Sequence, residues 1–345
     1  MDLMPGPEQE AIRDAIRGLL ADRLPSARVR QVMAMEIPAD PELWRAAAEL
    51  GWFGLHLPEQ AGGAGYGAAE AMLLFVELGR ALAPGPWLGT VLAARALAGD
   101  RGQRATLQRL LGGTLRAAVA DDPTGVLGSN AHLDGTLEGV LDLGAADAVL
   151  VLGPQHTGWL RLADAGVSVR SVPGMDPTRR LGTLRLSGVG AQRLDADPGA
   201  LRRLGTVLAA AEAVGVAERA LEASVEYAKV RQQFGKPIGT FQAIKHRCAD
   251  MATRTEVARA SVTWAAVALD DHDPEVAEWA HAAKALATRA ALENTHDNVQ
   301  NHGGMGYTWE SDAHLLLKRA RALEHCFGSR TAHLDALAAP WRSPA

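Results

Sequence analysis

Two segments in the last third of the chain carry the residue types most able to bind a ligand. The first, YAKVRQQFGKPIGTFQAIKHRCADM, spans residues 227–251 and places Arg231 at a predicted helix end, before a glycine turn. The second, NVQNHGGMGYTWE, spans residues 298–310 and contains paired glycines after a long helix. Paired glycines let a backbone approach a ligand where any Cβ would clash. A solvated arginine and a glycine helix cap are the alternatives that the local pattern leaves open.

Other reactive side chains give weaker signals. The 11 histidines show no metal-ligand spacing, so we predict no metal site. The two cysteines, Cys248 and Cys326, form neither a disulfide framework nor a metal knuckle, and no neighbour activates the thiol of Cys326. This cysteine use predicts a reducing, cytoplasmic location. The glycine-rich residues 62–67 lack the spacing and the lysine of a phosphate-binding loop.

The composition predicts a mainly helical protein of two or three globular units. Its 345 residues, 48% apolar and 22% charged, are too many for one ordinary domain and too hydrophobic for disorder. The net charge of −5 disfavours nucleic acid as a partner. We also predict no secretory leader and no membrane partner, because the N-terminus is acidic and the most apolar region, 71–99, is broken by Glu77, Arg80 and two prolines.

Hydrophobic periodicity divides the chain into three predicted domains. Helical spacing holds from residue 1 to about residue 115, and Asp40 before Pro41 is a predicted helix N-cap. Within residues 116–196, β-branched and leucine runs alternate with turn residues, which predicts a small antiparallel barrel or sandwich. The helical period returns in residues 197–345 and predicts a four-helix bundle that builds the core of an oligomer.

Together the two C-terminal segments resemble the C-terminal domain of the flavin-dependent acyl-CoA dehydrogenases. That family carries Y-x-x-x-R-x-x-F-G-x-x-I-x-x-F-Q, then a helix, then Q-x-x-G-G-x-G-[YF], in this order and at this separation. The string LWRAAAELGWFGLHLPEQAGGAGYG looks like the family's N-terminal helical domain, and the β unit occupies the place of its middle domain. The resemblance covers the whole chain and implies a mainly α fold with a small β domain.

The resemblance implies a site for FAD that is shared between subunits. In such enzymes the Arg and Phe of R-x-x-F-G contact the pyrophosphate and adenosine side of an FAD held mainly by a neighbouring subunit. Guanidinium groups and glycine N–H groups suit this task, because both donate hydrogen bonds to pyrophosphate oxygens. The residues of this chain that match the cofactor-binding set are Arg231, Phe234, Gln242, Gln300, Gly303 and Gly304.

The family reaction also requires a base, and the matching positions lack one. A carboxylate removes the α-proton of an acyl-CoA thioester while the β-hydride passes to the flavin, which gives a 2-enoyl-CoA. Most members place this Glu before a Gly-Thr or Gly-Ser pair, where this chain has Phe327 before Gly328 and Ser329. Other members place it on the first long helix of the C-terminal domain, where Gly205 stands here. We therefore predict no catalytic residue of that kind in this chain.

Two carboxylates lie nearest to the missing base. Glu324 precedes the Phe327 position by three residues and faces another side of its helix. Glu212 lies in an otherwise apolar stretch, so we expect it to be buried with a partner and favour a structural role over that of a displaced base. Arg202 and Arg203 precede Gly205, and we favour surface caps over a substitute for the family's missing cation.

The middle region departs from the family pattern as well. Members carry a T-E-P-x-x-G-S-D loop that holds the flavin ring, whereas this chain has ADDPTGVLGSN, and its Trp159 lies beyond the family's tryptophan position. The flavin-ring pocket is therefore predicted to be eroded. The chain looks like the shorter, base-lacking subunit of actinobacterial α2β2 heterotetramers of the steroid side-chain type, including the string WESDAHLLLKRARAL that begins at Trp309.

This resemblance implies participation in FAD-dependent α,β-dehydrogenation of an acyl-CoA, with a steroid-derived acyl chain suggested by the subfamily. The implied partner is a homologous subunit that carries the catalytic Glu. Two alternatives stay open. One is a self-sufficient homomeric enzyme that uses Glu212 or Glu324 as a displaced base. The other is a redox-inert scaffold or binding protein with the same fold.

Overall fold

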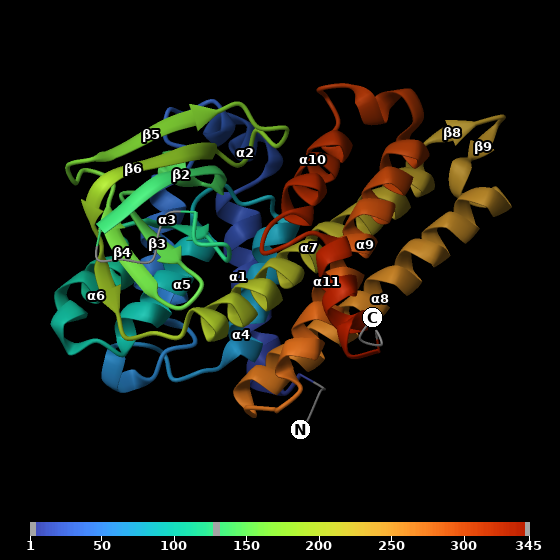
Figure 1. Cartoon of the computed structure of the whole chain (residues 1–345). Coiled ribbons are helices and arrows are strands. Elements are labelled where there is room, and N and C mark those ends of the chain that lie inside the picture. Colours follow the sequence, from blue (N-terminus) through green and yellow to red (C-terminus); the bar gives the residue numbers. More distant parts are fainter. Residues whose placement is uncertain (1–4, 127–131, 342–345) are drawn as a thin grey trace. The chain divides into compact units, whose positions relative to one another are not determined.

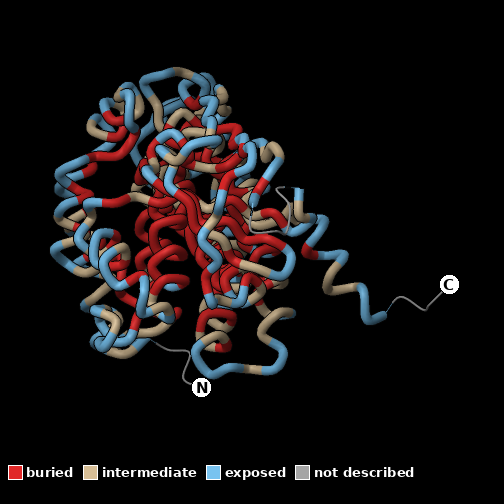
Figure 2. Tube along the Cα trace, turned by 60° about the vertical axis from the view of Figure 1, so that its left-hand side comes forward, coloured by how far each residue is buried: buried red, intermediate tan, exposed pale blue. Residues whose placement is uncertain are grey.

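The computed structural model describes residues 5–126 and 132–341, which divide into two compact units. Unit 1 comprises Met1–Ser26, Met72–Ala83 and Thr206–Ala345, and unit 2 comprises Ala27–Ala71 and Pro84–Gly205. Figure 1 labels the elements, and Figure 2 shows that buried stretches of chain are flanked by intermediate and exposed ones. Within the described ranges, no helix is both long enough and apolar enough to cross a membrane.

Helices form most of unit 1 and share unit 2 with the strands. They are α1 (Pro7–Arg23), α2 (Ser26–Met33), α3 (Pro41–Glu49), α4 (Ala68–Arg80), α5 (Trp87–Ala98), α6 (Arg104–Leu111), α7 (Pro198–Val230), α8 (Gln242–Asp270), α9 (Val276–His302), α10 (Ala313–Glu324) and α11 (Arg330–Ala338). The predicted N-cap of α3 is confirmed, because the Asp40 carboxylate accepts hydrogen bonds from the backbone N–H groups of Glu42 and Leu43, each at 3.0 Å.

The strands lie between α6 and α7, apart from one short hairpin. They are β1 (Ala117–Asp121), β2 (His132–Leu141), β3 (Ala148–Leu152), β4 (Thr157–Arg161), β5 (Val167–Val172), β6 (Leu181–Gly190) and β7 (Gln192–Leu194), with β8 (Gln232–Gln233) and β9 (Lys236–Pro237) in the hairpin. One sheet has the order β1-β3-β4-β7 and another has the order β2-β6-β5. All of their pairs are antiparallel except β1 with β3, which differs from the purely antiparallel prediction.

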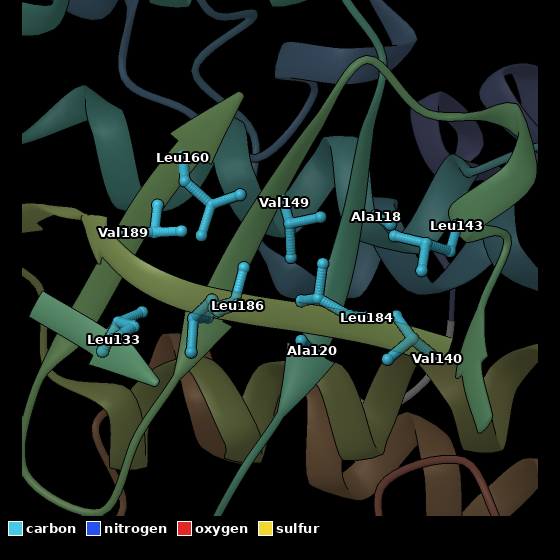
Figure 3. Packing of buried hydrophobic residues seen from close by; sticks show 11 residues of the cluster. Ala118, Ala120, Leu133, Val140, Leu143, Val149, Leu160, Leu184, Leu186 and Val189 are labelled. Carbon is cyan, nitrogen blue, oxygen red and sulfur yellow. The ribbon is translucent and has the colours of Figure 1, made fainter. Parts of the chain in front are cut away.

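The core of the β unit lies between these two sheets. Alternate residues of β1 and β3, such as Ala118 and Val149, point to the same space as Leu184 and Leu186 of β6 (Figure 3). The opposite face of the first sheet is covered by α5, and a Cβ on Gly89 of that helix would lie 2.3 Å from the carbonyl oxygen of Ala117. Because both faces are covered, every residue of β3 is buried.

The long helices of unit 1 pack through small residues and one polar network. A Cβ on Gly215 of α7 would lie 1.9 Å from the carbonyl oxygen of Val76 in α4, so only glycine permits this crossing. Farther along, the buried amide of Asn294 in α9 donates to the Met251 carbonyl at 3.0 Å and to the Thr255 hydroxyl at 2.8 Å, both in α8. These contacts fix the helix register because a buried amide must find its partners.

Candidate cofactor site

The β8–β9 hairpin carries one of the predicted ligand residues in an unfavourable backbone conformation. Its two-residue turn consists of Phe234 and Gly235, whose φ angles are +53° and +78°. Tight hairpin turns of this kind prefer Asn, Asp or Gly, because a bulky side chain is strained at positive φ. The Phe234 side chain nevertheless stands at this position and is 91% exposed. A residue that is unfavourable for its backbone conformation, and whose aromatic ring is exposed, is typical of a functional site.

The hairpin is fastened to the end of α7 and the start of α8. The backbone N–H of Ile238 donates to the carbonyl of Arg231 at 2.8 Å, which closes the chain around the hairpin. The rings of Phe234 and Phe241 meet edge to face with centroids 6.0 Å apart, and the ammonium of Lys236 lies 4.6 Å from the Phe241 centroid. These contacts restrict the hairpin although its tip faces solvent.

The paired glycines lie at the same end of unit 1. α9 ends at His302, whose ring stacks on that of Tyr227 in α7 with centroids 4.2 Å apart. The following 3-10 helix, η6 (Gly303–Tyr307), begins at a residue with φ +60°. A Cβ on Gly303 or Gly304 would meet no atom within 4 Å, so open space adjoins both residues. The chain ends of α7 and α9 therefore bring the two predicted ligand segments together (Figure 1).

The electrostatics of this end of unit 1 suit an anion. Residues 227–249 contain five Lys and Arg residues and no Asp or Glu, a charge pattern that can be read from the sequence and is not part of either motif. The Arg231 guanidinium forms no hydrogen bond or ion pair with any described residue. All six predicted cofactor residues are exposed, namely Arg231, Phe234, Gln242, Gln300, Gly303 and Gly304. We call this set the flavin tip.

The flavin tip fits part of a dinucleotide. The Arg231 guanidinium, unpaired among the described residues, suits pyrophosphate oxygens, and the exposed ring of Phe234 suits an adenosine group. The open space beside Gly303 and Gly304 lets a ligand approach the backbone. The site offers these groups on exposed residues at one end of unit 1. A ligand held by this set would need a second surface for its remaining groups.

Neither candidate displaced base is a free carboxylate. Nη1 of Arg319 donates to Oε1 of Glu212 at 2.7 Å, and both side chains are buried, as predicted for Glu212. Nη2 of Arg319 donates to the carbonyls of Leu82 and Ala83, at 3.2 and 3.4 Å. Glu324, at the end of α10, accepts from Arg321 at 3.0 Å. The first pair supports α10 against α7 and has no solvent access.

The loop of residues 325–329, between α10 and α11, contains the position at which most family members carry the base. It has Phe327 at φ +57° and Gly328 at φ +104°. The predicted absence of a carboxylate at this place follows from the residue type alone. The backbone shape is a separate finding, because left-handed phenylalanine costs about 1 kcal/mol or more and needs support from its surroundings.

The region that corresponds to the flavin-ring loop is occupied by contacts within unit 2. Nε of Arg202 donates to Asp121 at 2.7 Å, and its Nη2 donates to the Gly153 carbonyl at 2.8 Å, so the predicted surface cap was wrong for Arg202. Burial raises the pKa of Asp121, while the hydrogen bond and charge of Arg202 act in the opposite direction. Asp122 is buried and accepts from the backbone N–H of Val126 at 2.8 Å.

These contacts tie the loop to itself and to the start of α7, where Arg203 faces Asp197 at 3.7 Å. The predicted Gly-Ser-Asn portion of the loop, residues 128–130, lies outside the described residues. Trp159 is buried within β4 and pairs across the sheet with Leu150, so it packs in the β unit. In the described part of this loop, the carboxylates of Asp121 and Asp122 therefore accept hydrogen bonds from other groups of the same chain.

A cleft of about 550 Å³ lies elsewhere in unit 2 and gives no competing site. It is lined by Gln155, His156 and residues 193–198. The N-terminus of α7 opens into it, but both oxygens of Asp197 already accept from the first N–H groups of that helix, at 2.8 and 3.0 Å. No metal-binding cluster of His, Cys, Asp or Glu occurs in the described parts of the chain.

Comparison with known proteins decides the family. Residues 6–115 match the acyl-CoA dehydrogenase N-terminal domain, and residues 203–340 match the acyl-CoA dehydrogenase C-terminal domain. The chain belongs to the acyl-CoA dehydrogenase family. It is 38% identical to the acyl-CoA dehydrogenase IpdE2 of Mycobacterium tuberculosis, and the match covers 99% of this chain and all of that protein. As a member of this family it is an FAD-dependent oxidoreductase, and the predicted fold class and cofactor are confirmed.

Two solved structures resemble this chain over nearly its whole length. One is a steroid acyl-CoA dehydrogenase variant, Tcur3481-Tcur3483 G363A, with a TM-score of 0.88, 31% identity and coverage of 96% of this chain and 97% of that one. The other is the ChsE4-ChsE5 complex of Mycobacterium tuberculosis, with a TM-score of 0.89, 26% identity and full coverage of both chains.

Proposed function

We propose that this chain is the base-lacking subunit of a heteromeric acyl-CoA dehydrogenase and donates its flavin tip to FAD bound by a homologous partner. One observation carries the proposal. The six predicted cofactor residues are exposed at one end of unit 1, the Arg231 guanidinium has no partner among the described residues, and the strained Phe234 turn holds an aromatic ring out toward solvent. Groups arranged in this way complete a site whose other half lies on another chain.

In this arrangement the partner supplies the carboxylate that removes the substrate α-proton, and bound FAD supplies the hydride acceptor. Arg231 neutralises pyrophosphate charge, and Gln242 and Gln300 donate hydrogen bonds to the dinucleotide. Gly303 and Gly304 let the ligand approach the backbone. The role of this chain is therefore to bind and orient the cofactor rather than to move the substrate proton.

The nature of the relatives supports the same assignment. Two similar solved structures are complexes of two named chains, and one is a steroid enzyme. We propose an α2β2 assembly in the cytoplasm, acting on an acyl-CoA with a steroid-derived acyl chain. We also propose domain boundaries at about residues 115 and 196, which place the β unit between two helical domains.

The alternative of a self-sufficient homomeric enzyme with a displaced base is less favoured. Its candidate base Glu212 is neutralised by the buried Arg319, and proton transfer to it would have to break that pair without access to solvent. Glu324 is paired with Arg321 on the same helix. A carboxylate held in this way is a poor acceptor for the weakly acidic α-proton of a thioester.

The test is co-expression with a full-length homologous subunit that retains its catalytic Glu. We expect a complex that contains FAD and oxidises an acyl-CoA, whereas this chain purified alone is colourless and inactive. Arg231→Ala in the complex should weaken FAD retention about 10- to 100-fold, the loss expected for a charge-assisted hydrogen bond. Arg45→Ala, at an exposed position of α3, is the matched control and should leave FAD content unchanged.

Two results would reject the proposal. A yellow homomer of this chain that oxidises an acyl-CoA would favour the displaced-base alternative, and loss of that activity in Glu212→Gln or Glu324→Gln would identify the base. A complex that assembles but holds no FAD and has no activity would favour the redox-inert scaffold. Native mass measurement of the complex gives its subunit ratio independently of both readouts.

A further inference from the structure

A buried lysine of α9 contacts the loop of residues 325–329. Lys284 is fully buried, and its Nζ donates to the Leu323 carbonyl at 2.9 Å and to the Thr288 hydroxyl at 3.1 Å. The carbonyls of Glu324 and Gly328 lie 3.5 Å away. The ammonium therefore caps the C-terminal end of α10, where helix carbonyls lack partners and carry partial negative charge.

The same loop is held from its other side by α11. The backbone of Phe327 and Gly328 faces the ring of His333, and a Cβ on Gly328 would lie 3.1 Å from Nε2 of that ring. Nδ1 of His333 lies 2.8 Å from Nδ1 of His281 in α9, so one ring donates to the other. The unfavourable φ angle of Phe327 thus coincides with contacts to this loop from two helices.

Few charged groups face this lysine. The negative charge of Glu324 in α10, and that of the Cys326 thiol of the loop once it ionises, favour the ammonium, and His333 is the basic group of α11 nearby. The face that α8 buries contains Met, Thr, Ala and Val side chains, none of which titrates. On α10 the buried Arg319 is paired with Glu212 of α7. Among these groups, the ammonium of Lys284 is therefore the buried charge that can lose its proton near neutral pH.

We propose that Lys284 holds the loop of residues 325–329 in its strained shape only while the ammonium is protonated, so that the loop opens as the pH rises. A protonated amine donates three hydrogen bonds, and a neutral amine donates two. On deprotonation the amine keeps the Leu323 carbonyl and the Thr288 hydroxyl, which are its closer acceptors, and gives up Gly328. The strain at Phe327 then favours relaxation of the loop.

The expected pH range follows from the burial of the group. Burial lowers the pKa of Lys284 to about 8, while the charges of Cys326 and Glu324 oppose this change. Burial, with Lys284 and His281, lowers the pKa of His333 to about 4, so that ring stays neutral throughout the range in which the lysine titrates. Loop opening is therefore assigned to one group, and the inference does not depend on the proposed heteromer.

Hydrogen exchange of the full chain, measured by mass spectrometry from pH 6.5 to 9.5 and corrected for intrinsic rates, tests this inference. We expect protection of residues 325–329 to fall about tenfold around pH 8, while protection of β6 in unit 2 stays constant. Lys284→Met should leave the loop open at every pH. Lys318→Met, which removes a partly exposed lysine of α10, should behave as the original chain does.

Two charge variants keep the test decisive if Lys284→Met does not fold. Glu324→Gln and Cys326→Ser each remove a group whose negative charge favours the ammonium, so each should move the opening midpoint to lower pH. Loop protection that is constant across the pH range would overturn the inference. A midpoint that stays in place or rises in both variants would overturn it as well.

Discussion

The guanidinium of Arg319 and the carboxylate of Glu212 form a buried pair, with Nη1 and Oε1 separated by 2.7 Å across 107 residues of sequence. The pair explains why a carboxylate stands in the apolar stretch of α7 and why it is not free to act as a base. A buried charge that loses its partner is strongly destabilising, whereas replacement of both partners by apolar groups is often tolerated. This asymmetry separates a structural role from a catalytic one.

Glu212→Gln should lower the free energy of unfolding by about 3 to 5 kcal/mol, because Arg319 is then buried without a compensating charge. Thermal and denaturant unfolding would measure the loss. The double substitution Glu212→Leu with Arg319→Met should recover most of it, and the activity per folded complex should remain. If a stably folded Glu212→Gln complex lost its activity, the residue would have a catalytic role.

Phe234→Asn should stabilise the β8–β9 hairpin and weaken the flavin site. Asn tolerates the positive φ of this turn position, so we expect a gain of about 0.5 to 1 kcal/mol in unfolding free energy. Loss of the exposed ring should reduce FAD retention by the co-expressed complex. Trp341→Asn, which removes another exposed aromatic ring, is the control for surface effects. Equal FAD content in the Phe234→Asn complex would contradict the role given to this ring.

Gly215→Ala should be among the most damaging small substitutions in unit 1. The added Cβ would lie 1.9 Å from the Val76 carbonyl, so α4 and α7 would have to move apart, at a cost of about 1 to 3 kcal/mol or more. Circular dichroism melting would measure it. Gly18→Ala is the matched control, since a Cβ there meets no atom within 4 Å and alanine favours helix. A Gly215→Ala chain as stable as the control would show that this crossing is not close.

The buried imidazole of His56 should reduce stability in acid. Burial, with a smaller contribution from Arg95, lowers the pKa of His56 to about 3. Between the unfolded pKa of about 6.5 and this value, the unfolded chain binds a proton that the folded chain does not. Stability is therefore complete above pH 6.5 and falls as the pH decreases toward 3.

The expected contribution is about 2 kcal/mol between pH 7 and pH 5. Denaturant unfolding at several pH values would measure it. His56→Leu should flatten this part of the profile, while His246→Leu, at an exposed position, should leave the profile unchanged. His333 contributes a slope of the same sign, so some acid sensitivity should remain in the His56 variant.

Local patterns were enough to predict the helices and the β unit, whereas the residues of the flavin tip were predicted from the family resemblance and stay a prediction. Helical and strand periods follow from which faces are buried, and Asp40 caps α3 through N–H groups two and three residues away. The Phe-Gly turn and the acid-free stretch of residues 227–249 are also short-range signals. Such features depend on neighbours in sequence, so the sequence by itself determined them.

Only the tertiary structure decided what the buried charges do. Glu212 was expected to need a partner, but nothing nearby in sequence indicates Arg319, and Arg202 reaches Asp121 across 81 residues. Lys284 finds the Leu323 carbonyl 39 residues later in the chain. The partner of a buried charge is set by which helices and strands pack together, because only desolvated groups brought within hydrogen-bonding distance can compensate each other. Short-range sequence patterns do not predict which elements pack together.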